Sequence, residues 1–494
     1  MSAMLANAVR RGFYLDSVAL MRLSREIAAL PGVVEAAMMM GSPANRKILQ
    51  EAGLLGADGE AAAANDLVIA VRAETEAQAS DALAAATAAL DKPRARAQSS
   101  SAEQPRSLGG ALRALPEATL ALISVPGDFA AAEARRALRA GLDVMMFSDN
   151  VPLEAEVALK QEARALGRLV MGPDCGTAII DGRPLAFANH VPRGDIGIVG
   201  ASGTGMQEIA SLIALGGKGI SHAIGVGGRD LSREVGAIST LAAIDLLDAD
   251  AATHRIVVVS KPPHPEVARA VLDRVGRSRK PFTICFLGAT DLRTPVNAQA
   301  AATLRAAAQH ALGGTAIGGS QPHHGKRPRP GPIVGLFSGG TLGAEAQLIL
   351  VAGGRSVASN VPVPGAHVLT ATGGRFDRIL DLGSDEFTRG RPHPMIDPAI
   401  RTDMLRATLA DETIAVVLID LVIGTGAHAN PAAEIAAALR DASAGRPYVV
   451  ASVTGTEDDP QVRSRQVAAL ERAGVLVTPS NAHAAELALA LASG

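Results

Sequence analysis

From residue 119 onward, short uninterrupted runs of apolar residues alternate with stretches of helical periodicity. The runs include LALIS from Leu120, DVMMF from Asp143, IGIVG from Ile196 and IVVVS from Ile256. Strands that are apolar on both faces are typical of a parallel sheet that helices cover from both sides. The pattern therefore predicts an α/β fold made of tandem parallel sheets of the Rossmann or flavodoxin type.

Two polar stretches divide the chain into parts. Residues 91–109 and 313–331 lose the helical periodicity and are rich in proline, glycine and polar residues, which is typical of linkers. Residues 1–90 alternate strand-like and helical stretches and predict a small α/β domain. The remaining parts are expected to be three α/β units, at residues 110–191, 192–312 and 332–494.

The charge and the composition exclude several classes of protein. The 494 residues include 47 Lys and Arg against 49 Asp and Glu, and only 2% are aromatic. The chain therefore offers neither a basic surface for nucleic acid nor stacking platforms for bases. Cys175 and Cys285 are not spaced as metal ligands, so we expect no metal site. No apolar run reaches the roughly 18 residues of a membrane span, and the start lacks a signal-peptide core, so we expect a soluble cytoplasmic protein without membrane partners.

Two segments that lie far apart in the chain repeat one construction. GDIGIVGASGTGMQEIASLI from Gly194 and GPIVGLFSGGTLGAEAQLIL from Gly331 each combine a strand, a turn of Gly, Ser and Thr, and a helix with Glu in its first turns. A helix start presents free backbone N–H groups and the positive end of its dipole. Two such starts pointing at one spot would bind a phosphate or an acyl phosphate. The phosphate-binding residues predicted in this way are Ser202, Gly203, Thr204, Gly205, Ser338, Gly339, Gly340 and Thr341.

A simpler interpretation of both turns is that Ser and Thr cap ordinary helices, as they do in most proteins. Neither segment is a Walker loop, because GxxxxGK followed by Ser or Thr is absent, and no GxGxxG follows a strand. The duplication favours an anion site over simple caps, but the sequence leaves both interpretations open.

Several motifs together resemble succinyl-CoA synthetase. LALISVPGDFA from Leu120, MGPDCGTAI from Met171, GIVGASGTGMQE from Gly197 and AIGVGGRDL from Ala223 resemble its α chain, and the part from Ile333 resembles the carboxy-terminal domain of its β chain. The fusion of both parts behind a small amino-terminal domain, without an ATP-grasp domain, resembles the FdrA proteins. The resemblance makes the three units a CoA-binding-like Rossmann domain (residues 110–191), an α-chain ligase-like flavodoxin domain (192–312) and a β-chain-like flavodoxin domain (332–494).

The sequence departs from the synthetases at the groups that serve a phosphohistidine. Gln299 stands about where the resemblance places the phosphorylated histidine, and Lys261 stands where it places the glutamate that orients this histidine. A carboxylate suits an imidazole N–H, whereas an ammonium suits a phosphoryl oxygen, so both changes agree with a phosphate site that lacks a histidine carrier. The glycine loop for coenzyme A also has no counterpart, so the resemblance does not establish coenzyme A as a ligand.

The FdrA resemblance implies a particular activity. Such proteins are connected with purine and allantoin catabolism as the large subunit of an oxamate carbamoyltransferase, which converts oxalurate and phosphate to oxamate and carbamoyl phosphate. The chain would then bind carbamoyl phosphate between the two helix starts, work with other subunits and associate with itself. Lys261 or Arg229 would neutralise the departing phosphate, and His393, in a proline-rich loop, is a further catalytic candidate. Two alternatives remain: an acyl-CoA synthetase that forms ADP, and a noncatalytic scaffold that senses a metabolite.

A few further residues have both a structural and a functional interpretation. Cys175 has no basic neighbour, so we expect a packed thiol and no nucleophile. The segment Asp458-Asp459-Pro460 is expected to cap the helix that follows it, with contact to a substrate as the alternative. Asp420 ends an apolar run at the strand-end edge where α/β sheets bind ligands. If a distant histidine carried phosphate, His222 would be a candidate.

Overall fold

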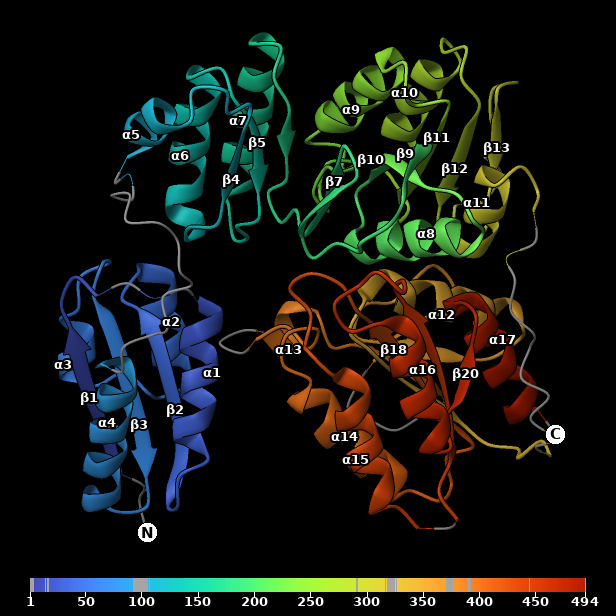
Figure 1. Ribbon diagram of the computed structural model, residues 1–494. Coiled ribbons are helices and arrows are strands. Elements are labelled where there is room, and N and C mark those ends of the chain that lie inside the picture. Colours follow the sequence, from blue (N-terminus) through green and yellow to red (C-terminus); the bar gives the residue numbers. More distant parts are fainter. Residues whose placement is uncertain are drawn as a thin grey trace. The chain divides into compact units, whose positions relative to one another are not determined.

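The computed structural model of the chain describes residues 4–13, 15, 17–91, 105, 107–289, 292–315, 317, 325, 327–369, 376–388, 392–443 and 445–493. Two compact units make up the chain. The first comprises residues 1–105 and 385–396, and the second comprises residues 106–384 and 397–494. Figure 1 shows the helices and strands of both units.

The first unit is a small antiparallel sheet with helices on both faces. Its strands run in the order β1-β3-β2, and the central strand is almost fully buried. Side chains alternate along β2, so Met38 and Met40 pack with α1 and α4, whereas Met39 packs with α2 on the other face. The elements are β1 (Met4–Arg10), α1 (Ser17–Ala28), β2 (Val33–Met40), α2 (Pro43–Glu51), α3 (Ala57–Glu60), β3 (Leu67–Ala73), α4 (Glu76–Asp91) and α13 (Asp385–Thr388).

Strand β1 is not evident from the sequence, because its residues MLANAVR include one β-branched side chain. It is a strand through its pairing, since it runs antiparallel to β3 from Met4 opposite Ala73 to Arg10 opposite Leu67. The pairing satisfies the backbone of β3 on the side that β2 leaves open.

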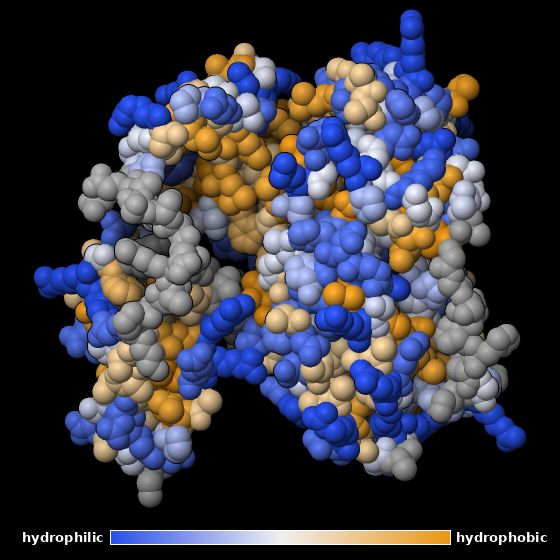
Figure 2. Space-filling model, viewed as in Figure 1, coloured by the Kyte–Doolittle hydropathy of each residue, from blue (hydrophilic) through white to orange (hydrophobic). Residues whose placement is uncertain are grey.

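Residues 107–171 begin the second unit with a small parallel sheet in the order β4-β5-β6. Its core joins Ile123 and Val144 to the alanine-rich faces of α6 and α7. Leu122 on β4 and Phe129 on α6 stay 51% and 42% exposed, and Figure 2 shows hydrophobic residues gathered over this part of the visible face. The elements are α5 (Leu108–Ala114), β4 (Leu120–Ile123), α6 (Gly127–Arg139), β5 (Asp143–Met146), α7 (Leu153–Ala165) and β6 (Val170–Met171).

The next sheet has the order β13-β12-β11-β9-β10-β7-β8. Strands β9 to β13 are parallel, and the hairpin β7–β8 joins them antiparallel through β10, with Ala223 opposite Ile179. The hairpin thus belongs to this sheet although it precedes the boundary expected at residues 191 and 192. The elements are β7 (Thr177–Ile180), β8 (Arg183–Ala186), β9 (Arg193–Gly200), α8 (Gly203–Leu215), β10 (Ile220–Gly225), α9 (Ile238–Ala249), β11 (Arg255–Ser260), α10 (Pro265–Val275), β12 (Phe282–Phe286), β13 (Ala298–Ala300) and α11 (Leu304–Ala311).

The last sheet is parallel throughout, in the order β16-β15-β17-β14-β18-β19-β20. Strand β14 lies between β17 and β18, so the carboxyl ends of three strands from distant parts of the chain meet at one edge. The elements are β14 (Ile333–Phe337), α12 (Gly340–Ala352), β15 (Val357–Ser359), β16 (His367–Val368), β17 (Asp377–Asp381), α14 (Ala399–Leu409), β18 (Val416–Val422), α15 (Pro431–Arg440), β19 (Tyr448–Thr454), α16 (Arg463–Arg472), β20 (Leu476–Thr478) and α17 (Asn481–Ala492).

The predicted α/β fold, with tandem parallel sheets behind a small α/β domain, is confirmed. The apolar runs that predict it are strands buried on both faces, among them β12, β14 and β18. In the described part of the chain, no helix combines the length and the hydropathy needed to cross a bilayer.

Candidate phosphate site

The two helix starts predicted from the repeat lie against each other. Helix α8 begins shortly after β9, and helix α12 begins shortly after β14. The hydroxyls of Ser202 and Thr341 share a buried hydrogen bond of 2.6 Å that joins the two starts. Two segments from different sheets therefore meet at one spot, which is the geometry that a shared anion site requires.

Glycines let the two starts come this close. A Cβ atom on Gly205 would overlap Ser202 Oγ and would lie 3.1 Å from Thr341 Cγ2. A Cβ atom on Gly339 would lie 3.0 Å from Cβ and Cγ2 of Thr204. The contacts are reciprocal, because each start places a glycine against a threonine of the other. These glycines therefore serve the packing of one helix start on the other, in addition to any approach of an anion.

The start of α8 is capped by its own serine. Ser202 Oγ accepts a hydrogen bond of 3.1 Å from the Gly205 N–H, which is the ordinary cap considered above. The N–H groups of Gly203 and Thr204 have no hydrogen-bond partner within the described residues, and both residues are half-buried. Two donors and the positive end of the helix dipole therefore remain available to an anion at this start.

The start of α12 is held by a carboxylate from a neighbouring strand. Asp420, on β18, accepts hydrogen bonds of 2.7 Å from the N–H groups of Ser338 and Gly339. Arg401 donates to Ser338 Oγ over 2.8 Å and to the Asp420 main-chain oxygen over 2.7 Å. Asp420 and Arg401 are both buried. Burial raises the pKa of Asp420, and the Arg401 guanidinium opposes this rise. Two donors predicted for phosphate are therefore already bonded to an internal carboxylate.

A second carboxylate, Asp381, faces the same start from the other side of β14. Strand β17 pairs with β14 so that Asp381 lies beside Phe337, the last residue of that strand. A Cβ atom on Gly340 would overlap Asp381 Oδ2, so the carboxylate lies directly against the first turn of α12. The Gly383 N–H donates to Asp381 Oδ1 over 3.0 Å. Its other oxygen, Oδ2, accepts no hydrogen bond from the part of the chain that the structure describes.

Lys261, the cation predicted for this site, lies near Asp381. Burial raises the pKa of the Asp381 carboxyl, and the Lys261 ammonium opposes this rise. Lys261 is exposed and follows β11, on the sheet that carries α8. Its ammonium forms no hydrogen bond or ion pair with the described residues. A positive charge is therefore available beside the start of α12.

Two buried glutamates lie at matching positions, five residues into α8 and α12. Glu208 accepts hydrogen bonds from Thr454 Oγ1 (2.5 Å) and from the Asn481 N–H (2.9 Å). Glu345 accepts from the Leu304 N–H (2.6 Å) and from Asn481 Nδ2 (2.7 Å). Burial raises the pKa of Glu208, and it raises that of Glu345 to about 7. The sequence indicates both glutamates, but it does not indicate that one asparagine joins them.

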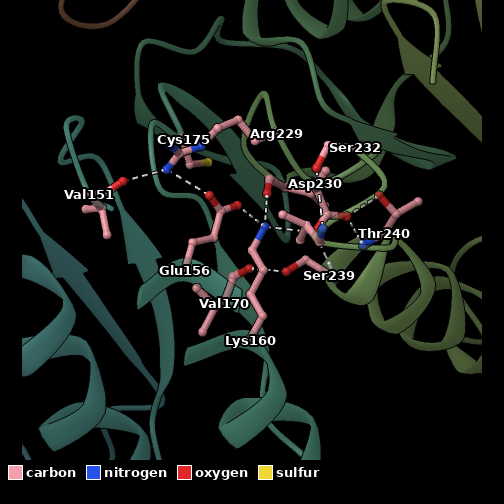
Figure 3. Close-up of polar contacts among 12 residues, drawn as sticks. Val151, Glu156, Lys160, Val170, Cys175, Arg229, Asp230, Ser232, Ser239 and Thr240 are labelled. Carbon is pink, nitrogen blue, oxygen red and sulfur yellow. Dashed lines mark hydrogen bonds and ion pairs between the residues drawn. The ribbon is translucent and has the colours of Figure 1, made fainter. Parts of the chain in front are cut away.

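Arg229, a predicted catalytic residue, is itself exposed but pairs with a buried cluster of charged residues, drawn in Figure 3. Its guanidinium lies 2.8 Å from Glu156 Oε2 and donates over 2.8 Å to the Val151 main-chain oxygen. The Lys160 ammonium lies 2.9 Å from Glu156 Oε1 and 2.7 Å from Asp230 Oδ1. These contacts hold Arg229 against α7 and the loop before it, and its catalytic role stays a prediction.

The same cluster fixes the start of α9. Asp230 accepts hydrogen bonds from the N–H groups of Ser239 (3.2 Å) and Thr240 (2.8 Å). Ser239 Oγ in turn donates to the Val170 main-chain oxygen over 2.7 Å. Because Lys160 and Asp230 are fully buried, each needs the other to compensate its lost hydration. The cluster therefore joins the sheet of β4–β6 to the sheet that carries α8.

The histidine-related predictions fall elsewhere. His393 lies in the first compact unit, where its Nδ1 accepts a hydrogen bond of 3.2 Å from the Met395 N–H, so its role at the helix starts stays a prediction. Gln299 is exposed on the edge strand β13. His222 Nδ1 accepts a hydrogen bond of 3.0 Å from the Asp181 N–H.

Two structural expectations have opposite outcomes. Cys175 is a buried free thiol whose pKa is raised to about 12 by burial, as expected for a packed side chain. The prediction that Asp458-Asp459-Pro460 caps α16 is wrong, because the N-cap residue is Val462, without a side-chain cap. Asp459 accepts from the N–H groups of His190 (2.7 Å) and Thr456 (2.8 Å) instead. Its partners Asn189 and His190 come from a loop far away in the chain, which sequence spacing cannot reveal.

Three family models match consecutive parts of the chain. They are "AllF, heavy metal-associated domain" over residues 2–106, "CoA binding domain" over residues 193–288 and "CoA-ligase" over residues 336–491. The chain thus combines a CoA-binding domain with a CoA-ligase domain. These matches support the acyl-CoA synthetase alternative rather than the carbamoyltransferase.

The solved structures that the chain resembles include acyl-CoA enzymes. Acetyl-coenzyme A synthetase 1 of Ca. Korarchaeum cryptofilum is 17% identical, with a TM-score of 0.32, over 76% of this chain and 82% of that one. The ATP citrate lyase of Methanosaeta concilii is 19% identical, with a TM-score of 0.33, over 42% of this chain and 36% of that one. TM-scores this low give the likeness no weight for function.

The start of α8 lies within the residues matched by the CoA-binding model. Its two unpaired N–H groups fit a phosphate group of coenzyme A or of an acyl phosphate. The glycines at the end of β10 and just after it have another use. A Cβ atom on Gly225 or Gly227 would overlap the main-chain oxygen of Thr177 or Pro173 respectively, so both glycines admit the protein's own backbone.

The name of the first model implies a heavy metal, but the residues do not fit one. Residues 2–106 contain neither cysteine nor histidine, the usual ligands of soft metals. The thioethers of Met38, Met39 and Met40 are buried in the two cores of the sheet. In the described part of the chain, no cluster of His, Cys, Asp and Glu could hold a metal ion.

One curated protein matches the chain over nearly its whole length. It is "Uncharacterized protein YahF" of Escherichia coli (strain K12), which is 39% identical over 504 residues, covering 97% of each chain. The chain therefore belongs to the YahF family, in which an AllF-type amino-terminal domain precedes CoA-binding and CoA-ligase domains.

Proposed function

We propose that the chain is a CoA-ligase-type enzyme that acts on an acyl phosphate at the paired starts of α8 and α12. The observation that carries the proposal is the hydrogen bond of 2.6 Å between Ser202 and Thr341, because it brings two helix N-termini to one spot. Each helix terminus carries roughly half a positive charge, so the pair attracts a dianion that one terminus alone would attract weakly.

The groups that remain unpaired suit a phosphate. The described contacts leave the N–H groups of Gly203, Thr204, Gly340 and Thr341 without partners. The Lys261 ammonium adds a full positive charge. Donors fixed by the backbone need no reorganisation when charge develops, which is how such sites stabilise a departing phosphate.

The reaction that fits these groups is exchange of an acyl group between phosphate and a thiol. Coenzyme A supplies the thiol, whose sulfur attacks the acyl carbon, the bond from that carbon to the phosphate oxygen breaks, and the thiol proton passes to the departing phosphate. The departing phosphate takes the electron pair and stays at the helix starts. The chain contains no Walker loop and resembles synthetases without their ATP-grasp domain, so we propose the acyl phosphate itself as the substrate.

A second candidate is carbamoyl transfer from carbamoyl phosphate to oxamate, as in the FdrA-type assignment. It is favoured by two residues at the positions of the synthetase's phosphorylated histidine and of the glutamate that orients it. Gln299, in place of the histidine, is exposed on an edge strand, and Lys261 stands in place of the glutamate. Its phosphate would bind at the same helix starts. We propose that further subunits and self-association complete such a complex.

The two candidates are separated by their acceptors. The purified chain is incubated with acetyl phosphate and coenzyme A, and in parallel with carbamoyl phosphate and oxamate, and the products are separated by liquid chromatography with mass detection. Acetyl-CoA would support the ligase-type proposal, and oxalurate would support the carbamoyltransferase instead. If neither product forms, although inorganic phosphate binds, the chain is a phosphate-binding subunit without an activity of its own.

A further inference from the structure

We propose that Asp381 is a phosphoryl acceptor, whose Oδ2 forms an aspartyl phosphate with the phosphoryl group of an acyl phosphate bound at the helix starts. The inference rests on the proposed function, because it needs an acyl phosphate at that site. It adds a second reaction of the bound acyl phosphate, at phosphorus instead of at the acyl carbon, and names a group that carries phosphate where the histidine is missing.

The position of Asp381 suits a nucleophile. It ends β17 at the carboxyl edge of the sheet, and its main chain is fixed by Asn360, which accepts from the Asp381 N–H (2.9 Å) and donates to its carbonyl oxygen (3.0 Å). The carboxylate is anchored through Oδ1 by the Gly383 N–H. Oδ2 has no hydrogen-bond partner among the described residues and points at Gly340, the first residue of α12. One oxygen is therefore held while the other is presented to the helix start.

Asp420 shows that this arrangement is particular to Asp381. Both carboxylates lie on strands beside β14, at the same edge of the sheet. Asp420 is 0% exposed, and its two oxygens are bonded to the N–H groups of Ser338 and Gly339. Asp381 is 8% exposed, so it is mostly desolvated but reachable. Of the two, only Asp381 has an oxygen available for a new bond.

The surroundings supply the charge that phosphoryl transfer needs. Gly340 lies directly against Oδ2, so the positive end of α12 lies beside this carboxylate. Lys261 interacts with the same carboxylate and would meet the phosphoryl oxygens. The Asp420 carboxylate also acts on this group, and Arg401 compensates its charge. An incoming phosphate therefore meets one nucleophilic carboxylate among donors and a cation.

The step balances without any further reactant. The lone pair of Oδ2 attacks phosphorus, a new O–P bond forms, and the bond from phosphorus to the acyl oxygen breaks. The acyl group leaves as a carboxylate, or as carbamate from carbamoyl phosphate, and takes the electron pair with it. No proton moves and nothing is oxidised. Attack by water or by a second acceptor on phosphorus then frees Asp381 again.

The test uses the whole chain with acetyl [32P]phosphate or carbamoyl [32P]phosphate as probes, in buffer with magnesium. We expect covalent label that hydroxylamine removes, and reduction with borohydride should convert residue 381 to homoserine, as detected by peptide mass spectrometry. Asp381→Asn is nearly isosteric and keeps an acceptor for the Gly383 N–H. This variant should carry at least ten-fold less covalent label than the wild type. Asp411→Asn, at an exposed turn, is the matched control and should label normally.

The outcomes separate this inference from the proposed function. Label that resists hydroxylamine and is lost in acid would indicate a phosphohistidine and would overturn the role of Asp381. Product formation by the wild-type chain without any covalent label would also overturn it, while leaving the proposed function standing. Absence of label together with absence of phosphate binding would remove both proposals. Because the chemistry of the label is read on the wild-type chain, the test does not depend on how well the variant folds.

Discussion

The starts of α8 and α12 come from the same sequence pattern, yet they are held in different ways. At α8, Ser202 caps its own helix by accepting from the Gly205 N–H. At α12, the cap residue Gly339 has no side chain, and the carboxylate of Asp420 reaches in from β18 to bond the turn. The first start leaves the N–H groups of Gly203 and Thr204 for an external anion. The second start has bonded the N–H groups of Ser338 and Gly339 to an internal carboxylate and leaves only the donors that follow them. The duplicated pattern therefore does not mean duplicated function.

The difference has a physical origin in the position of β14. Because β14 lies between the parallel strands β17 and β18, the carboxyl ends of both neighbours lie beside the turn that follows β14. Each neighbour of β14 ends near the turn with an aspartate, Asp381 on one side and Asp420 on the other. The two roles follow from what each carboxylate meets: a buried arginine for Asp420 and an exposed lysine for Asp381.

Among the variants that test this difference, removal of Arg401 should cost the most stability. Arg401→Met should lower the free energy of unfolding by roughly 3–5 kcal/mol, because it leaves the Asp420 carboxylate buried without its partner. The measurement is guanidinium denaturation followed by circular dichroism. Arg406→Met, on the exposed side of the same helix, is the matched control and should stay within about 0.5 kcal/mol of the wild type. A loss no larger than that of the control would show that the ion pair does not hold the α12 start.

The pH dependence of stability should report the glutamate on α12. Burial raises the pKa of Glu345 from 4.5 to about 7, so the folded state binds the proton more tightly than the unfolded state. The stabilisation is complete below pH 4.5 and is lost as the pH rises through about 7. The loss amounts to roughly 3 kcal/mol at most. The free energy of unfolding, measured by denaturation at several pH values from 5 to 8, should therefore change less with pH in Glu345→Gln than in the wild type. Glu471→Gln, on the exposed side of α16, should keep the wild-type slope, and an unchanged slope in Glu345→Gln would contradict the assignment.

Packing between the starts should come next in size. Gly339→Val would press a branched side chain against Thr204, whose Cβ and Cγ2 lie 3.0 Å from the position of a new Cβ. Overpacking of this kind costs about 1–3 kcal/mol, which calorimetry would detect as a lower Tm. Gly228→Val is the control, since nothing lies within 4 Å of a Cβ there. Equal Tm values for the two variants would mean that the starts are not in close contact.

The smallest effect is expected at the α8 cap. Ser202→Ala removes the bond to the Gly205 N–H and the bond to Thr341, and should cost about 1 kcal/mol for the cap and a similar amount for the second bond. Ser107→Ala removes a cap of the same kind on α5, where Ser107 Oγ forms no further hydrogen bond with the described residues. The difference between the two losses of unfolding free energy measures the bond between the starts. Equal losses in the two variants would mean that Ser202 is an ordinary helix cap and that its bond to Thr341 adds no stability.

Much of this architecture follows from the sequence, because buried strands and glycine-rich turns leave local patterns. The apolar runs predict the sheets, and the repeat predicts the two helix starts that Ser202 and Thr341 join. The partners of those starts are not local. Asp381 and Asn481 reach the site only because the sheet order puts β17 beside β14, and because α17 begins beside both glutamates. The one available signal is an aspartate at the end of an apolar run, which singles out Asp420 but does not distinguish its role from that of Asp381.

The most direct test of the account is the binding of inorganic phosphate, measured by isothermal titration calorimetry. Lys261→Met removes the exposed charge beside the helix starts, whereas Lys218→Met removes an exposed lysine beyond the other end of α8. The account predicts that phosphate binds the wild-type chain and Lys218→Met alike. Lys261→Met should bind about ten-fold or more weakly, since a charged hydrogen bond contributes roughly 1.5–3 kcal/mol. Equal affinity in all three proteins, or no binding to the wild type, would contradict a phosphate site at the paired helix starts.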